Sequence, residues 1–139
     1  STGTSTLDEV KQSINLLDNV AIILLHCVSS YPCHLDGSNL PRINHLKSLS
    51  NNIGYSDHVQ GVEVAKISLE FDLNVIEKHF TIDNDLPGRD NKFAILPEEL
   101  KSLVDYIKNR QLSLIDNGGD YLESEKEVRE IYSGRFDNS

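Results

Sequence analysis

The sequence has few lysines and arginines, the basic residues that bind nucleic acids and anionic membranes. It has 13 lysines and arginines against 22 aspartates and glutamates in 139 residues, a formal net charge of −9. Because phosphate backbones and anionic lipid surfaces are bound by clustered basic side chains, neither is an expected partner. No apolar run approaches the roughly 20 residues of a membrane-spanning helix. Residues 1–6 also lack the charged and apolar regions of a secretion signal.

Cysteine, proline and glycine are scarce as well, at two, four and eight residues. Cys27 and Cys33 could form a disulfide, but Cys27 closes a very apolar run, where a buried free thiol is the usual finding. Two cysteines in an acidic chain favour a reducing compartment, so we expect a cytoplasmic protein. The chain has no internal repeat, and it has no glycine-rich loop of the types that cradle nucleotide phosphates.

Helical and strand patterns alternate along the chain. Thr6 and Glu9 form a capping-box pattern, and residues 20–25 are an unbroken apolar run typical of a strand covered on both faces. The periodicities predict helices near 6–18, 40–50, 61–72 and 97–112, and strands at 20–27, 52–57 and 73–80. Such alternation predicts an α/β fold with parallel strands and right-handed crossovers. We expect one domain at 1–117, followed by a charged tail or linker at 118–139.

Polar side chains gather at the C-terminal end of each predicted strand, which is where parallel α/β folds place their active sites. His26 follows Leu25 at the end of the first strand. Because side chains alternate along a strand, two pairs share a face: Ser56 with His58, and Glu77 with His79. Adjacent strands lie about 4.8 Å apart, so the last two histidines could reach one ion. Two imidazoles leave coordination positions open, as catalytic metal sites do. The alternative is two unrelated polar histidines.

The motifs at these strand ends resemble those of the sialic acid synthase family. The resembling segments follow the family's order and cover most of residues 1–117: Ser1-Thr2-Gly3, Leu24-Leu25-His26-Cys27 with Tyr31-Pro32, Gly54-Tyr55-Ser56-Asp57-His58, Val75-Ile76-Glu77-Lys78-His79-Phe80-Thr81 and Leu86-Pro87-Gly88-Arg89-Asp90. The family's fold is a (β/α)₈ barrel followed by an antifreeze-like domain. The resemblance therefore implies a partial TIM barrel with parallel strands, from the end of strand five through helix eight.

A complete barrel needs roughly 250 residues. The first four strands, the lysines that the family uses on phosphoenolpyruvate and the antifreeze-like domain have no counterpart in this sequence. We expect residues 1–139 alone to be inactive, and to form a homo-oligomer or to associate with the other half of the barrel.

The resemblance implies a role for each candidate residue. His58 and His79 bind a divalent ion, manganese or alternatively magnesium. Glu77 is the candidate catalytic residue that positions or activates water; its alternative role is to orient a metal-bound imidazole. The remaining candidates hold substrates: Ser1, Ser29 and Ser56 for phosphoenolpyruvate, and Tyr31 and Asp90 for the N-acetylated amino sugar. Tyr31 could instead only pack on the rim of the site.

The expected function is therefore part of a synthase that condenses phosphoenolpyruvate with an N-acetylated hexose, N-acetylmannosamine or a related sugar. The product is a nine-carbon sialic-acid-type sugar, and phosphate is released. Arg89 stands where the family commonly has proline, which leaves the identity of the sugar open. Two alternatives remain: a non-catalytic half-barrel, and another phosphoenolpyruvate-dependent aldol-type barrel enzyme.

Overall fold

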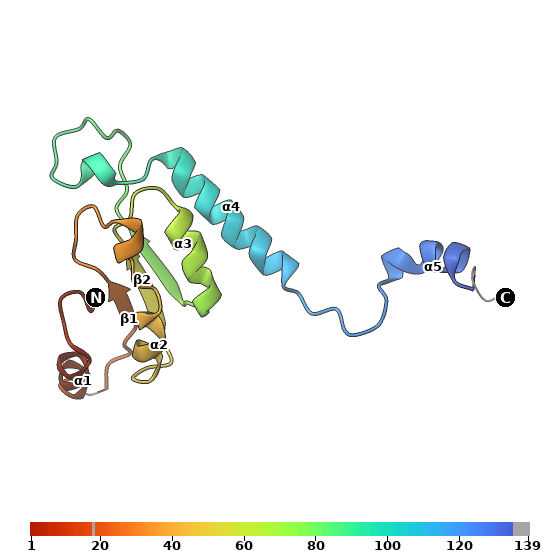
Figure 1. The fold of residues 1–139 in the computed structure, drawn as a ribbon, viewed down its shortest axis with the longest axis horizontal. Coiled ribbons are helices and arrows are strands. Elements are labelled where there is room, and N and C mark those ends of the chain that lie inside the picture. The colour runs from red at the N-terminus through yellow and green to blue at the C-terminus, as the bar shows by residue number, and fades with distance from the viewer. Residues whose placement is uncertain (18, 135–139) are drawn as a thin grey trace. The chain divides into compact units, whose positions relative to one another are not determined.

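The computed structural model describes residues 1–17 and 19–134, in which helices and strands alternate (Figure 1). In chain order the elements are α1 (Leu7–Asn15), β1 (Leu24–Cys27), α2 (Arg42–Lys47), β2 (Ile53–Asp57), α3 (Glu63–Ser68), β3 (Val75–Lys78), α4 (Pro97–Ser113) and α5 (Lys126–Tyr132). Contacts divide the chain into two units, Ser1–Lys108 and Asn109–Ser139.

The first unit is organised around a parallel sheet in the order β1-β2-β3. Its register pairs Cys27 with Ser56, and Ser56 with Glu77, so the carboxyl ends of the strands meet at one edge. The predicted α/β class and the parallel arrangement are confirmed. Residues 1–3 run beside β1, where the Thr2 amide donates to the Leu25 carbonyl over 2.9 Å.

Helices cover one face of the sheet, which we call the outer face (Figure 1). Alternation along β1 and β2 turns Leu24, Ile53 and Tyr55 to this face, where they pack with Ile43 and Leu46 of α2. Thr6 and Glu9 form the predicted capping box at the start of α1, with the Glu9 carboxylate accepting from the Thr6 amide over 2.7 Å. A second cluster joins Ile76 of β3 to α3 and to Leu103 of α4. Burial of these apolar side chains fixes the outer face against its helices.

The opposite, inner face of the sheet carries the predicted site. Gly54 lies on it, and a Cβ there would come within 2.4 Å of Val75 and 2.5 Å of Leu25. Those two side chains thus close over the glycine and fill the layer beneath the site. The face is only partly covered, since Val75 is 38% exposed. That exposure belongs to β3; on β1, Leu25 is half-buried and Cys27 is buried, so the inner face is covered more fully at the first strand.

The first strand is also shorter than expected. Residues 20–23 lie outside the sheet, because pairing with β2 starts at Leu24 opposite Ile53. A strand exists only where a neighbour accepts and donates its backbone hydrogen bonds, and apolarity alone does not extend it. The first helix ends at Asn15, and residue 18 of the predicted span lies outside the described residues.

The second unit consists of the end of α4, a connecting segment and α5. Arg129 of α5 lies over the Tyr121 ring, 4.6 Å from its centroid. Residues 135–139 of the predicted tail lie outside the described residues. The predicted division of the chain at residues 117 and 118 stays a prediction. No helix in the described ranges is both long and apolar enough to cross a bilayer.

Candidate active site

Ser56 and Glu77 form the floor of the site on the inner face of the sheet. They are register partners on adjacent strands, and the Ser56 hydroxyl donates to the Glu77 carboxylate over 2.7 Å. Cys27 is the register partner of Ser56 on the other side. Sequence alternation predicted the shared faces within each strand, and the register adds this contact between strands.

The two candidate metal ligands stand just beyond the floor. The rings of His58 and His79 have centroids 5.2 Å apart, tilted by 43°. His58 is 7% exposed, and its Nδ1 lies 3.0 Å from the Val28 carbonyl oxygen. Since a carbonyl only accepts, Nδ1 must carry the proton, and the Nε2 lone pair of the neutral ring is left for another partner. That backbone contact is the usual support for a metal-bound imidazole.

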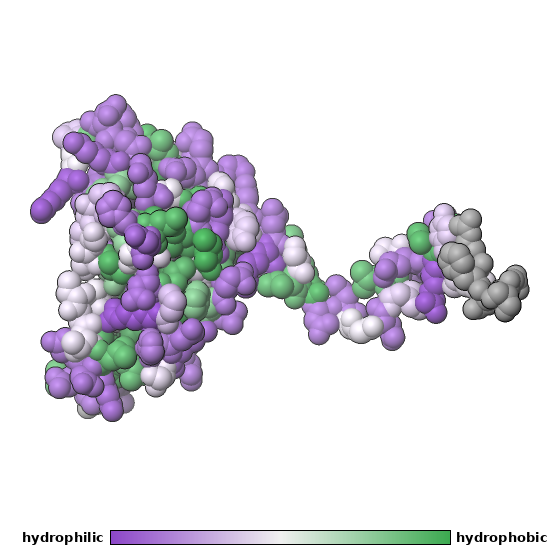
Figure 2. Space-filling model, in the orientation of Figure 1, coloured by the Kyte–Doolittle hydropathy of each residue, from purple (hydrophilic) through white to green (hydrophobic). Residues whose placement is uncertain are grey.

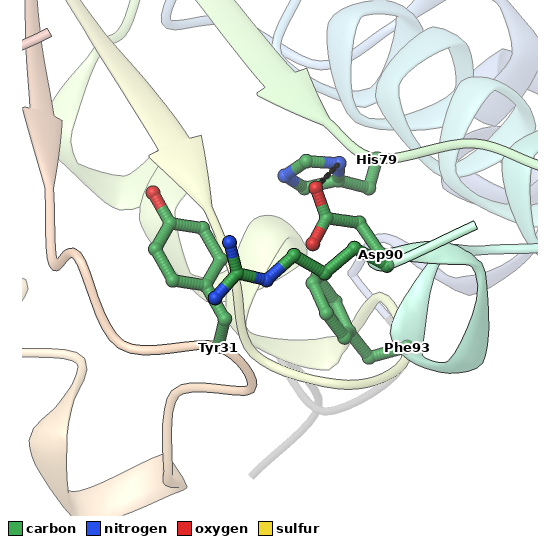
Figure 3. A pocket seen from close by; sticks show the side chains of 5 residues that line it. Tyr31, His79, Asp90 and Phe93 are labelled. Carbon is green, nitrogen blue, oxygen red and sulfur yellow. Dashed lines mark ion pairs between the residues drawn. The ribbon is translucent and has the colours of Figure 1, made fainter.

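His79 has an acidic neighbour from the loop that follows β3. Its Nδ1 lies 4.0 Å from Oδ2 of Asp90, and Figure 3 shows these two side chains pointing toward one another. The structure therefore brings the predicted sugar-binding carboxylate against the predicted metal ligand. Within residues 1–17 and 19–134, no group of three His, Cys, Asp or Glu side chains could enclose an ion. The site offers two imidazoles at most, a fit for an ion that keeps open positions.

Tyr31 bridges the loop after β1 and the histidine pair. Its ring centroid lies 4.4 Å from that of His58 and 6.2 Å from that of His79. The ring also lies 6.1 Å from that of Phe93, across the pocket drawn in Figure 3. Tyr31 is 53% exposed, so it keeps a free surface while it packs on the rim.

The serines expected to contact phosphoenolpyruvate are not all together. Ser56 lies on the floor, and Ser29 lies beside Gly3, where an added Cβ would come within 2.2 Å of the Ser29 hydroxyl. Ser1 is exposed, and among the described residues no hydrogen bond joins it to the other candidates. The phosphate-contact assignment stays a prediction for all three serines.

His26 does not belong to this site. It points to the outer face, stacks on Tyr55 at a ring distance of 5.4 Å, and its Nε2 donates to the Ser38 carbonyl over 2.8 Å. Its Nδ1 is buried and has no hydrogen-bond partner among the described residues. Burial lowers the pKa of His26, because the charged imidazolium would lose its hydration. Burial likewise raises the pKa of Tyr55, with the Asp57 carboxylate adding to the effect.

A buried ion pair on the outer face ties together the strand ends that carry the histidines. Lys78 donates to Asp57 over 2.9 Å and to the Val59 carbonyl, and the two paired side chains are 6% and 0% exposed. Asp57 also accepts from the Tyr55 hydroxyl over 3.0 Å and from the Val59 amide over 2.9 Å. The outward direction of Lys78 follows from strand alternation, but its partner emerges only from the register.

Three side chains near the site have no assigned role in the sequence analysis. Cys27 is a buried free thiol, as expected, and its Sγ lies 3.8 Å from Nδ1 of His58. Alternation from Ser29 back to Cys27 could have placed it on the inner face. Arg89 and Phe93 line the pocket with Tyr31, but nothing in the sequence spacing of a loop predicts that contact.

Comparison with known proteins bears on the whole of this arrangement. A family model described as the NeuB family matches residues 1–118. The chain belongs to the NeuB family. It is 37% identical over 122 residues to an N,N'-diacetyllegionaminic acid synthase of Campylobacter jejuni, covering 84% of this chain and 36% of that protein. An N-acetylneuraminate-9-phosphate synthase of Drosophila melanogaster is 33% identical over 120 residues, covering 83% of this chain and 32% of that protein.

A solved NeuB-type structure bears on the fold. The N-acetylneuraminic acid synthetase of Leptospira borgpetersenii, crystallised in complex with citrate, has a TM-score of 0.77 at 35% identity, over 96% of this chain and 48% of that one. The predicted family and fold class, a partial barrel with parallel strands, are thereby confirmed. The chain spans about a third of the length of the curated NeuB relatives it matches.

Proposed function

We propose that this chain supplies one side of the active site of a synthase that condenses phosphoenolpyruvate with an N-acetylated hexose. The product would be a nine-carbon sialic-acid-type sugar, released with phosphate. One observation carries the proposal: in a member of a family of such synthases, Ser56, Glu77, His58 and His79 converge at the carboxyl edge of one parallel sheet. That edge is where barrel enzymes assemble their sites.

His58 and His79 are the side chains that would hold a divalent ion, manganese or alternatively magnesium. The donor set supports this, because the Val28 carbonyl fixes the proton on Nδ1 of His58, which leaves the Nε2 lone pair without a hydrogen-bond partner among the described residues. When bound, the ion would polarise the open-chain aldehyde of the sugar as a Lewis acid.

In the reaction, the electron pair of the double bond between carbons two and three of phosphoenolpyruvate forms the bond to the sugar's aldehyde carbon, and the aldehyde oxygen takes up a proton as its π bond breaks. Water then adds to carbon two and loses one proton. The bond from carbon two to the phosphate oxygen breaks, and the hydroxyl derived from water loses its second proton as the ketone forms. Glu77 is the group that would orient this water and accept its proton. Glu77 is an exposed residue of the inner face, two residues before His79 in the chain.

Ser56 and Glu77 act as a coupled pair. A hydroxyl has one proton, and that of Ser56 is donated to Glu77 over 2.7 Å. Ser56 can donate to the phosphate of phosphoenolpyruvate only by turning that proton away from the carboxylate. Phosphate binding would thus exchange the Ser56–Glu77 hydrogen bond for one to the phosphate, and it would leave the Glu77 carboxylate oxygen available to accept from the attacking water.

The two sugar-binding candidates suit the acceptor. Tyr31 offers an aromatic face and a hydroxyl beside the histidine pair, and Asp90 offers an acceptor for sugar hydroxyls within 4.0 Å of His79. Both come from loops after strands, so an acceptor between them would have its reactive end at the histidines.

The described residues around Ser56 and Glu77 lack free cationic side chains, and we propose that another part of a barrel or a second copy of the chain supplies them. Phosphoenolpyruvate carries several negative charges, and clamping it normally takes cations. Among the described residues that line the hollow around Ser56 and Glu77, the one lysine or arginine is Lys78, and its ammonium group is paired with Asp57. The partly exposed inner face would be covered by the remaining strands of a barrel or by a second copy. The missing cations favour one alternative for residues 1–139 alone, a non-catalytic half-barrel.

The test measures phosphate release from phosphoenolpyruvate with N-acetylmannosamine and manganese, for residues 1–139 with and without the remaining barrel strands. We expect turnover only in the combined sample, and its loss in His79→Ala. His45→Ala, an exposed histidine of α2, is the matched control and should keep full activity. Absence of phosphate release with every amino sugar in the combined sample would refute the proposed function.

A further inference from the structure

A pocket of about 510 Å³ adjoins the histidine pair (Figure 3). Its lining comes from the loop after β1, the end of β3 and the loop before α4: Tyr31, His79, Arg89, Asp90 and Phe93. It is distinct from the smaller hollow of about 210 Å³ over the floor residues Ser56 and Glu77. The two spaces share His79, so a molecule in each would meet at that side chain.

The pocket holds one cation that lacks a carboxylate partner in the structure. Within residues 1–17 and 19–134, no acidic side chain lies within 4.0 Å of the Arg89 guanidinium, although the chain has 22 acidic residues. The adjacent carboxylate, Asp90, turns to His79 instead. Arg89 therefore brings an unneutralised positive charge to the lining of a pocket in a chain whose net charge is −9.

The guanidinium group of Arg89 favours ligands that carry a phosphate or carboxylate group. Its planar fork of N–H donors matches two oxygens on one centre, as in phosphate and carboxylate groups, and it has no acceptor to offer a sugar hydroxyl. Tyr31 and Phe93 give the pocket aromatic walls suited to a sugar ring, and Asp90 supplies the acceptor for hydroxyls. A neutral sugar could accept from Arg89 through a hydroxyl or carbonyl oxygen, but it would leave the positive charge of the guanidinium uncompensated.

We propose that Arg89 recognises an anionic substituent on the acceptor, so that the preferred acceptor is an acidic N-acetylated hexose bearing a phosphate or a carboxylate. The inference rests on the proposed function and adds the class of acceptor to it. Arg89 lines the larger pocket and not the hollow over Ser56 and Glu77, so the anion it meets is the acceptor's and not that of phosphoenolpyruvate.

The experiment titrates residues 1–139 calorimetrically with four compounds. They are N-acetylmannosamine, its 6-phosphate, N-acetylmannosaminuronic acid and phosphoenolpyruvate. We expect one or both acidic sugars to bind about tenfold more tightly than the neutral sugar, and this preference to fade at high salt. Comparison of the phosphate with the uronic acid identifies which anion Arg89 takes.

Three variants locate the effect. Arg89→Gln should lower the affinity for the acidic sugars to that for N-acetylmannosamine while phosphoenolpyruvate still binds. Arg89→Lys should retain part of the preference as a point charge. Lys92→Gln removes the same unit charge from an exposed side chain that does not line the pocket, and it should bind as the unaltered chain does. Unchanged circular dichroism spectra would verify that each variant is folded.

The outcomes separate this inference from the proposed function. Equal affinity for neutral and acidic sugars, or an unchanged preference in Arg89→Gln, would overturn the inference while the proposed function stands. Loss of phosphoenolpyruvate binding in Arg89→Gln would also overturn it, since the guanidinium would then serve the other substrate. Absence of binding by any sugar, together with no turnover in the combined sample, would overturn both.

Discussion

Replacing Lys78 by methionine should destabilise the sheet and loosen the site at the same time. The side chain is 6% exposed, and its partner Asp57 is fully buried. Methionine keeps most of the volume of the lysine side chain but removes its charge. The buried Asp57 carboxylate is then left without a countercharge, and little cavity is created. Breaking one partner of a buried pair typically costs about 3–5 kcal/mol. We expect about 3 kcal/mol, the lower end, because the Tyr55 hydroxyl and the Val59 amide still donate to the carboxylate.

The assay is urea unfolding of the full chain followed by far-ultraviolet circular dichroism, since the sequence has no tryptophan to report by fluorescence. The double variant Asp57→Asn with Lys78→Met has no buried charge at this place, and it should be more stable than Lys78→Met alone. Lys101→Met is the matched control, because it removes an ion pair with Asp105 on the exposed side of α4, and its unfolding midpoint should not move.

The same variant tests the link to the site. The pair joins the residues that directly precede His58 and His79, so its loss should also weaken manganese binding. A loss of less than about 1 kcal/mol for Lys78→Met, the value of exposed pairs, would refute the reasoning. With Asp57→Asn measured alone as well, a double variant whose loss of stability equals the sum of the two single losses would refute it equally, because no coupling would then exist between the two charges.

Three further predictions concern metal, pH and association. His79→Ala should abolish or strongly weaken manganese binding in a calorimetric titration, whereas His45→Ala should not; equal binding would remove the metal assignment. Because the pKa of His26 is lowered in the folded chain, the unfolded chain binds a proton at a higher pH than the folded chain does. The contribution of His26 to the free energy of unfolding is therefore full above pH about 6.5, and it is lost as the pH falls toward the folded-state pKa. His26→Phe should flatten that dependence in unfolding measurements between pH 7 and 5, and an unchanged slope would contradict the burial argument. Residues 1–139 should self-associate at micromolar concentration, because apolar side chains are exposed around the sheet (Figure 2), and a monodisperse monomer in sedimentation would count against this.

The sequence by itself determined the alternation of helices and strands and the identity of the strand-end residues. The apolar period of the segments and the capping box at Thr6 are local properties, so they could be read without neighbours. Alternation also gave the shared face of Ser56 with His58 and of Glu77 with His79, because side-chain direction along a strand has a period of two.

Where the first strand begins could not be read locally. The apolar run from residue 20 predicted a longer strand than Leu24–Cys27, because its start depends on where β2 enters the sheet. His26 shows the same limit: its position near the end of a strand suggested the site, but its side chain packs on Tyr55 and donates to the Ser38 carbonyl on the outer face.

Tertiary structure alone decided which residues meet across strands and loops. The Ser56–Glu77 hydrogen bond and the Lys78–Asp57 pair depend on the register between β2 and β3, which is set by burial of the whole outer face. The place of Arg89 beside Tyr31 depends on two loops separated by more than fifty residues, whose conformations have no periodic signal. Sequence pattern fixes the chemistry that each strand end carries, whereas register and loop closure decide which of those groups can act on one substrate.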